Sequence, residues 1–238
     1  MLTRRMFCGC IPAFAGFAAS GAAAQGLQAG ACEVFSRERQ SAKTPQAALE
    51  RLREGQERFL AGKTINCDLM SQVKSSAAGQ APFAAVVGCI DSRVPVELVF
   101  DQRIGDLFVA RIAGNFVNTD IIGSLEFATR ISGAKLIVIL GHSDCGAIKG
   151  AVDNVRIGNL GATLANIAPA VLAVSGVEGP RSSSNAALVQ AVAEMNVRIA
   201  AEALTARSAI LHEMVEAKEL AIVGAMHDLA SGRVTFLG

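Results

Sequence analysis

Two short blocks of the sequence carry side chains of the kind that bind a metal ion: residues 89–93 read CIDSR and residues 142–146 read HSDCG. Together they offer the thiol groups of Cys89 and Cys145 and the imidazole of His142. Three protein ligands of this type are typical of a catalytic zinc, whose fourth position stays open for water, whereas a structural zinc usually has four. We therefore predict a metal site that performs chemistry.

The hydrophobic runs that precede the two blocks predict where these side chains lie. Residues 82–88 (PFAAVVG) and 135–141 (KLIVILG) are short, rich in aliphatic side chains and end in glycine, which is typical of buried strands. Both blocks would then follow strands at the carboxyl edge of a parallel α/β sheet, where such folds place their sites. The alternative, two inert buried cysteines and a core histidine, does not account for the convergence of three ligands with a charged pair beside them.

The two blocks resemble the signatures of the β-class carbonic anhydrases, which read Cys-x-Asp-Ser-Arg and His-x-x-Cys-Gly. The likeness covers about residues 45–238, and the further segments that carry it are 52–63, 107–115, 119–133 and 220–237. This resemblance implies an α/β fold with a mostly parallel central β-sheet flanked by helices and an N-terminal helical arm that packs on a partner subunit. It also implies a homodimer or homotetramer that catalyses the reversible hydration of carbon dioxide to bicarbonate and a proton, that is, a carbonate dehydratase.

By the same resemblance, Cys89, His142 and Cys145 hold one Zn²⁺ per subunit, and Asp91 with Arg93 forms the catalytic dyad. Two thiolates and a neutral imidazole cancel the charge of the zinc ion, and a bound water then loses a proton near neutral pH. The resulting zinc-bound hydroxide attacks carbon dioxide. Asp91 is suited to orient this hydroxide, and it can also swing onto the metal and close the site unless Arg93 holds it in a bidentate pair. An Asp–Arg pair taken alone is more often a surface ion pair.

Two further residues are candidates for the substrate pocket. Gly146 either lets backbone amides approach the site or simply begins the next helix, and Asn115 either borders the pocket or is a turn residue. His227 stands where relatives often carry tyrosine, and a proton-shuttle role is the alternative to packing. Because the sequence holds no Trp and no Tyr, the pocket of Trp, Arg and Tyr in which some bacterial relatives hold an inhibitory bicarbonate cannot form in its usual way.

Residues 1–24 resemble a twin-arginine export signal. Arg4 and Arg5 precede a stretch rich in alanine and glycine, and small residues at 22–24 suit cleavage before Gln25. The stretch is short and only mildly hydrophobic, which disfavours a membrane anchor. An ordinary Sec signal is the alternative, whereas a lipoprotein attached at Cys32 is disfavoured because residues 28–31 (QAGA) lack the usual leucine at the right offset. We expect a periplasmic protein that meets the membrane only through its export signal.

The six cysteines fit this scheme. Cys8 and Cys10 leave with the signal, two others bind the metal, and Cys32 and Cys67 remain. In an oxidising compartment these two either form a disulfide or stay single and buried, and the sequence alone does not establish their proximity.

The remaining sequence divides into a polar linker at 25–43 and a single catalytic domain at 44–238. Thr44 is expected to cap a helix that opens with Pro45, and residues 234–237 are expected to add an edge strand. We also expect helices at 160–174 and 206–218. A net charge of +1 without a basic patch gives no support to nucleic-acid binding.

Two functions besides carbon dioxide hydration are compatible with these residues. The same fold and metal suit a hydrolase of carbonyl sulfide or carbon disulfide, which only the residues that line the pocket would distinguish. The second is that of a catalytically silent zinc-binding protein. Such a protein needs neither Asp91 nor Arg93, so the presence of both argues against it.

Overall fold

The structure, a computed structural model, describes residues 32, 33 and 35–237. The expected export signal and residues 25–31 of the expected linker lie outside this part of the chain. None of the helices in the described part combines the length and the hydrophobicity needed to span a bilayer.

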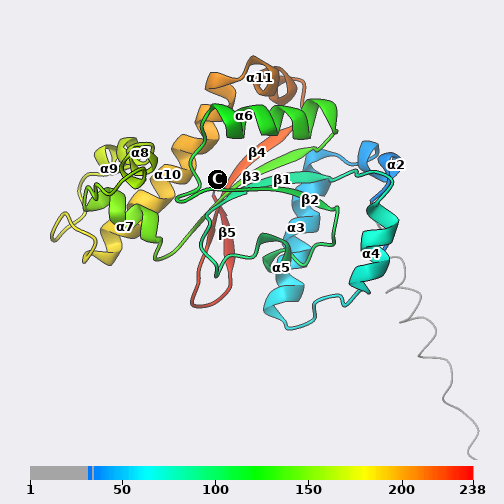
Figure 1. Ribbon diagram of the computed structural model, residues 1–238, viewed down its shortest axis with the longest axis horizontal. Helices are drawn as coiled ribbons and strands as arrows, with labels where there is room; N and C mark the ends of the chain where they lie inside the picture. Colours follow the sequence, from blue (N-terminus) through cyan, green and yellow to red (C-terminus); the bar gives the residue numbers. More distant parts are fainter. Residues whose placement is uncertain (1–31, 34, 238) are drawn as a thin grey trace, which may run out of the picture. The chain divides into compact units, whose positions relative to one another are not determined.

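A five-stranded sheet with the strand order β2-β1-β3-β4-β5 forms the centre of the fold (Figure 1). Its strands are β1 (Ala84–Gly88), β2 (Leu107–Arg111), β3 (Leu136–His142), β4 (Ala221–His227) and β5 (Val234–Leu237). The first four strands are parallel, and β5 pairs antiparallel with β4 at one edge. The predicted α/β fold with a mostly parallel sheet is therefore confirmed, and so are the two buried strands before the metal-binding blocks and the edge strand at 234–237.

Helices cover both faces of this sheet (Figure 1). They are α2 (Arg37–Ser41), α3 (Pro45–Leu60), α4 (Leu69–Ser76), α5 (Val96–Val99), α6 (Thr119–Glu126), the π-helical turn η1 (Phe127–Ile131), α7 (Gly146–Val152), α8 (Leu160–Ala165), α9 (Ala168–Ala173), α10 (Ala186–Arg207) and α11 (Ala209–Glu216). As expected, Thr44 caps α3, whose first residue is Pro45. Part of the expected linker is helical, because Ser36 caps α2.

Two expected helices are each divided in the structure. The segment 160–174 forms α8 and α9, since Pro169 in the first turn of α9 has no N–H group to continue a helix from α8. The segment 206–218 contains the end of α10 and all of α11. Ser208 separates them, because its side chain accepts a hydrogen bond from the backbone N–H of Leu211 and so begins a new helix.

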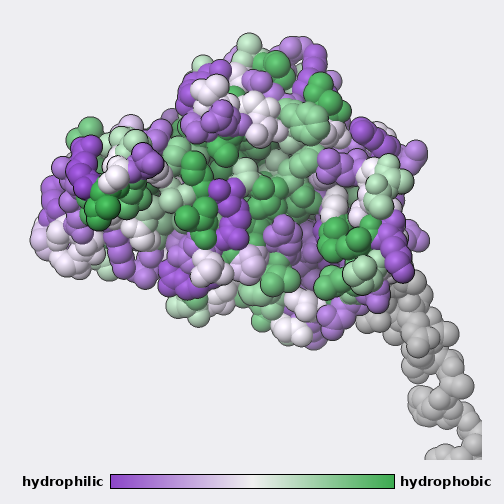
Figure 2. Space-filling view, in the orientation of Figure 1, coloured by the Kyte–Doolittle hydropathy of each residue, from purple (hydrophilic) through white to green (hydrophobic). Residues whose placement is uncertain are grey.

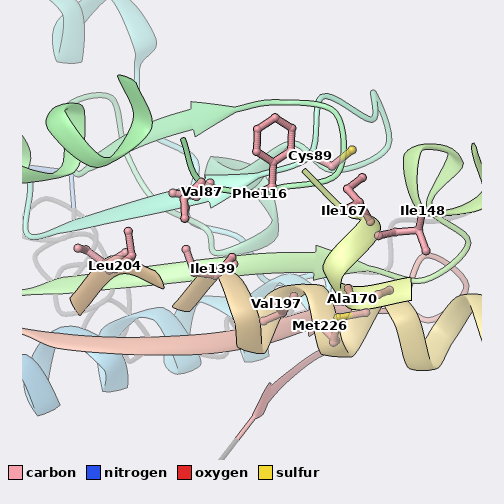
Figure 3. Packing of buried hydrophobic residues seen from close by; sticks show 14 of the residues in the cluster. Val87, Cys89, Phe116, Ile139, Ile148, Ile167, Ala170, Val197, Leu204 and Met226 are labelled. Carbon is pink, nitrogen blue, oxygen red and sulfur yellow. The ribbon is translucent and has the colours of Figure 1, made fainter. Parts of the chain in front are cut away.

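Alternate residues of the central strands belong to two separate hydrophobic clusters, as the period of two along a strand requires. Val87 and Ile139 point to the face covered by α6 and α10 (Figure 3). Val86 and Val138 point to the opposite face, where α3 contributes Leu49 and Leu52. Leu49 and Leu52, the hydrophobic residues in the first half of α3, are therefore buried within their own chain.

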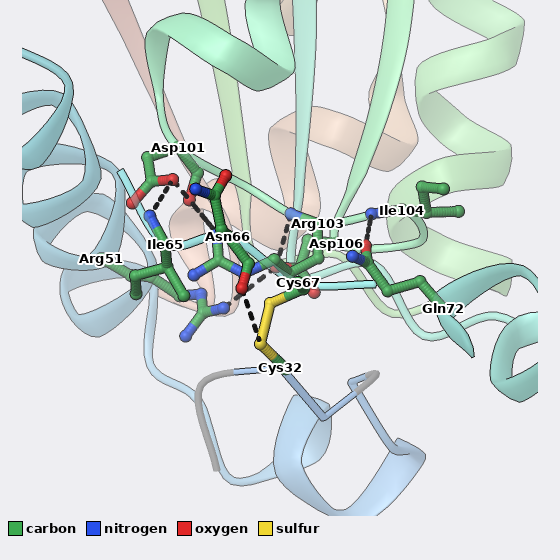
Figure 4. The surroundings of a disulfide bond; sticks show 10 residues. All are labelled: Cys32, Arg51, Ile65, Asn66, Cys67, Gln72, Asp101, Arg103, Ile104 and Asp106. Atoms are coloured by element: carbon green, nitrogen blue, oxygen red, sulfur yellow. Dashed lines mark hydrogen bonds and ion pairs between the residues drawn. A yellow bond between two sulfur atoms is a disulfide. The ribbon is translucent and has the colours of Figure 1, made fainter. Parts of the chain in front are cut away.

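A disulfide joins Cys32 to Cys67, the second of which lies in the loop between α3 and α4 (Figure 4). The bond decides between the two possibilities that the sequence left open for these cysteines. Beside it, the carboxylate of Asp101 accepts hydrogen bonds from Arg58 Nε (2.5 Å) and from the backbone N–H of Ile65 (3.1 Å). The disulfide fastens the loop after α3 to the segment that precedes α2, and the contacts of Asp101 fasten the same loop to the segment that follows α5.

Candidate metal centre

The ends of β1 and β3 bring the three predicted metal ligands together. The two strands are neighbours in parallel register, Cys89 directly follows β1, and His142 is the last residue of β3. Cys145 stands immediately before α7. The ligand atoms of these three side chains all lie within 4.8 Å of one another, and all three residues are buried.

The imidazole of His142 is prepared to bind a cation through one nitrogen. Its Nδ1 atom lies 2.9 Å from the carbonyl oxygen of Ser143, and a neutral ring donates its proton there. The Nε2 atom is buried and has no hydrogen-bond partner among the described residues. A buried polar atom without a partner is costly, and a metal ion would complete its bonding.

The two cysteine sulfurs lie 3.9 Å apart and share a hydrogen bond. The bond from Cys145 lowers the pKa of the Cys89 thiol to about 4, whereas the same bond, together with burial, raises the pKa of the Cys145 thiol. In the absence of metal the pair therefore holds one proton between two sulfurs, and a divalent cation would replace it. Two thiolates and one imidazole form a donor set that suits zinc.

Asp91 and Arg93 form a bidentate pair at the rim of this cluster. Arg93 donates from Nε to Oδ1 (2.9 Å) and from Nη2 to Oδ2 (2.7 Å) of Asp91, and its backbone N–H also donates to Oδ1 (3.0 Å). The hydrogen bonds from the guanidinium hold the pKa of the Asp91 carboxyl well below its usual range. The Oδ2 atom lies 3.9 Å from Nε2 of His142. An ionised carboxylate thus stands beside the three ligands while Arg93 engages both of its oxygens.

A second carboxylate faces Arg93 from the other block. Oδ2 of Asp144 lies 3.9 Å from Nη1 of Arg93, and Oδ1 of Asp144 contacts the ammonium group of Lys149. Asp144 adopts a left-handed backbone conformation (φ 56°). All three side chains are exposed, so this contact orients Arg93 only weakly.

Sequence reasoning missed two groups that contact the site. Arg111, the last residue of β2, donates from Nε to the carbonyl oxygen of Cys89 (2.8 Å) and from Nη2 to that of Asp91 (2.5 Å). The backbone N–H of Gly114 donates to the sulfur of Cys89 (3.4 Å). The position of Arg111 in the sequence could have indicated its contact, because the last residue of the strand beside β1 lies next to the residues that follow β1.

A hollow of about 280 Å³ opens beside the cluster. Cys89 and Asp91 border it, and the rest of its wall is hydrophobic or glycine, including Ile90, Gly146 and Leu160. Such a wall suits a small molecule without charge. Gly146 lines this hollow, and it is also the first residue of α7.

The structure places the other two residues of interest away from this hollow. Asn115 does not line it; the residue lies buried in the turn after β2 with a left-handed backbone (φ 41°). His227 pairs in register with His142 on the neighbouring strand and is also buried. Neither ring nitrogen of His227 has a hydrogen-bond partner among the described residues, and burial lowers the pKa of this imidazole.

Comparisons with known proteins agree on one family. Residues 84–234 match the model of the carbonic anhydrase family. The chain is 36% identical over 195 residues to carbonic anhydrase 2 of Mycobacterium tuberculosis, a match that covers 79% of this chain and 91% of that protein.

Solved structures give the same result. A tetrameric β-carbonic anhydrase of Sordaria macrospora superposes with a TM-score of 0.60 at 29% identity, over 69% of this chain and 85% of that one. The β-carbonic anhydrase CcaA superposes with a TM-score of 0.64 at 25% identity, over 80% of this chain and 95% of that one.

Proposed function

Because the chain belongs to the β-class carbonic anhydrases and interconverts carbon dioxide and bicarbonate, we propose that three of its side chains hold the zinc ion and that two others form the catalytic dyad. The ligands are Cys89, His142 and Cys145, and the dyad is Asp91 with Arg93. The observation that carries this assignment is the convergence of two buried thiols on the unpartnered Nε2 atom of His142. Zinc, when bound there, supplies a Lewis acid that activates water near neutral pH.

The role of Asp91 follows from the contacts of its carboxylate. The guanidinium of Arg93 takes one lone pair from each oxygen, which fixes the plane of the group and keeps it ionised. The backbone N–H of Arg93 takes the second lone pair of Oδ1, so the lone pair that remains on Oδ2 can accept a proton-bearing group of the reactant and so set its orientation. Arg93 at the same time holds the carboxylate off the metal ligands, which favours an open site.

The hollow beside the ligands completes the site. Carbon dioxide has no net charge and no hydrogen to donate, so it gains little from polar groups and is accommodated by a hydrophobic wall. Ile90 and Leu160 provide such a wall next to Cys89 and Asp91. Bicarbonate is charged and is disfavoured by the same wall, which helps its release.

Stopped-flow hydration of carbon dioxide, combined with metal analysis, tests the ligand assignment. The zinc-loaded protein is expected to turn over and to hold one zinc per chain, and His142→Ala is expected to lose both properties. His212→Ala is the matched control, because His212 is exposed and contacts none of the ligands. Full zinc content and activity in His142→Ala would refute the assignment.

We further propose that the protein is a homo-oligomer, a dimer or a tetramer, with β2 at a subunit interface. The solved relative of Sordaria macrospora is tetrameric. Hydrophobic residues gather over β1, β2 and α6 in Figure 2. In η1, which follows α6, Phe127 and Ile131 are 50% and 67% exposed. A hollow of about 680 Å³ lies between Phe108 of the edge strand and α6.

An edge strand whose hydrophobic side chains are only half-buried favours association. Packing of the N-terminal helical arm on a partner belongs to this proposal. Light scattering of the purified protein measures its mass; Phe127→Asp should lower that mass, whereas a monomeric wild-type protein would overturn the proposal.

Finally, we propose that the protein is exported to the periplasm by the twin-arginine route. The pair Arg4-Arg5 motivates the route. The disulfide between Cys32 and Cys67 supports an oxidising compartment, because such bonds seldom persist in a reducing cytoplasm. Cell fractionation with N-terminal sequencing should find a shortened periplasmic chain, and replacement of both arginines by lysine should retain it in the cytoplasm. An intact cytoplasmic wild-type chain would rule the proposal out.

A further inference from the structure

The turn after β2 presents a backbone N–H group to the metal site. Gly114 donates this N–H to the sulfur of Cys89 (3.4 Å). Its backbone is in the left-handed region (φ 86°), and a Cβ atom there would stand 2.5 Å from Cδ1 of Ile167. Figure 3 shows Ile167 and Cys89 at the same end of the core cluster. Only glycine therefore fits a position from which the peptide reaches this sulfur.

The carbonyl of the same glycine is held from the opposite side by α10. Nδ2 of Asn196 donates to the carbonyl oxygen of Gly114 (2.8 Å) across 82 positions of sequence. Asn196 is 3% exposed and lies on a hydrophobic face of the helix, between the buried side chains of Val192 and Val197. Burial of an amide in such surroundings is costly unless it is hydrogen-bonded, so its bond to Gly114 accounts for a polar residue at this position.

The ends of the turn are fastened independently of Asn196. The backbone N–H of Ile112 donates to the carbonyl of Gly88 (3.0 Å), and that of Asn115 donates to the carbonyl of Ile112 (3.0 Å). Loss of the Asn196 side chain would therefore leave the turn in place. The peptide between Gly114 and Asn115 would keep the bond made by its N–H but lose the bond to its carbonyl, so the neighbouring peptide that carries the N–H of Gly114 would be held less firmly.

We infer that Asn196 is a positioning residue for the metal centre: by fixing Gly114, it keeps an N–H···S hydrogen bond on Cys89 and so sets how much charge this sulfur donates to the metal. The inference rests on the proposed role of Cys89 as a ligand. A hydrogen bond to a thiolate withdraws charge from the sulfur, which leaves a bound cation more electrophilic. A metal centre that activates water gains from this effect.

Cobalt absorption spectroscopy separates this role from a purely structural one. Co²⁺ bound by thiolates shows a sulfur-to-metal charge-transfer band whose energy reports the charge on sulfur. The first variant is Asn196→Leu, which matches the shape of the amide but has no donor. The second is Asn196→Ser, whose side chain is too short to reach Gly114; it serves as the test if Asn196→Leu does not fold. The matched control is Gln56→Leu, because Gln56 Nε2 makes the same kind of bond to the carbonyl of Gly232 (3.0 Å) away from the site.

Both Asn196 variants are expected to bind one Co²⁺ per chain and to shift the band to lower energy, since sulfur regains charge when the N–H turns away. Zinc affinity, measured against a chelator, should change by about 10- to 100-fold. The control should keep the wild-type band even where its stability falls. A charge-transfer band at the wild-type energy in both Asn196 variants would overturn this inference and leave the ligand assignment standing. A wild-type protein without any such band would overturn the ligand assignment itself.

Discussion

The guanidinium of Arg111 is hydrogen-bonded to the backbone carbonyl of Cys89, with 2.8 Å between Nε and the oxygen. Its second bond, to the carbonyl of Asp91, spans the short segment that joins a proposed metal ligand to the proposed dyad. Arg111 thus ties the end of β2 to the backbone that carries both functions. A side chain that sets the distance between two functional groups is expected to matter for activity more than for stability.

Replacement of Arg111 by Gln removes both of these bonds and should lower the turnover of the zinc-loaded protein by about 10-fold or more, the range found for groups that orient metal ligands. Arg111→Lys keeps the charge but cannot donate to both carbonyls in one plane, so it should restore little. Arg233→Gln, at an exposed arginine before β5, is the control. Stopped-flow rates at matched zinc content measure the effect, and equal losses in Arg111→Gln and in the control would contradict it.

Asp91 and Arg93 should behave as one unit in a double-mutant cycle. Asp91→Asn is expected to leave zinc bound while activity falls by about 10- to 100-fold. Arg93→Ala releases the carboxylate, whose Oδ2 already lies 3.9 Å from a ligand nitrogen, and it should then compete for the metal. Because either change removes the same arrangement, the double variant should be little worse than the poorer single one. Additive losses would show that the two residues act separately.

Removal of the metal should expose the site to oxidation. The sulfurs of Cys89 and Cys145 lie 3.9 Å apart, and the lowered pKa of the Cys89 thiol keeps it largely as the reactive thiolate. Chelated protein kept in air should therefore lose two titratable thiols and fail to take up zinc until it is reduced. Protein kept loaded with zinc should retain both thiols over the same period. Retention of both thiols by the chelated sample would argue against the short contact.

The buried imidazole of His227 should make the protein less stable in mild acid. Burial is the main cause that lowers the pKa of this imidazole in the folded state, whereas Asp228 acts in the opposite direction. The unfolded chain binds a proton here below the ordinary value of about 6.5, so the stabilising contribution is present above that pH and is lost as pH falls towards the folded pKa.

Urea unfolding at about pH 7.5 and about pH 5.5 tests this prediction. His227→Phe does not titrate, so its free energy of unfolding should depend less on pH over this interval than that of the wild type. His212→Gln, which removes an exposed histidine instead, is the comparison. An unchanged pH dependence in His227→Phe would show that other groups are responsible.

The parts of this site that follow from local sequence patterns could be predicted. Aliphatic runs predicted β1 and β3, and the strand ends then placed Cys89 and His142 at one edge of the sheet. Arg111 and Asn196 could not be found in this way. Their partners lie 22 and 82 positions away, and each acts on a backbone carbonyl, which leaves no signature in the residue types.

Helix boundaries and the cysteine pairing mark a similar limit. The division of the segment 160–174 depends on one proline, and a hydrophobic pattern continues across it. The pairing of Cys32 with Cys67 depends on how the loop after α3 folds back, and the residues next to either cysteine do not indicate that path. Composition allowed this bond but did not require it.

The disulfide bears on the order in which this protein binds zinc and is oxidised. Cys32 and Cys67 are oxidised to form the disulfide, whereas Cys89 and Cys145 must stay reduced to bind a cation. A thiolate that already holds a metal is a poor partner for exchange with a disulfide. Under the proposed ligand assignment we therefore expect zinc to bind Cys89 and Cys145 before the oxidant reaches the chain.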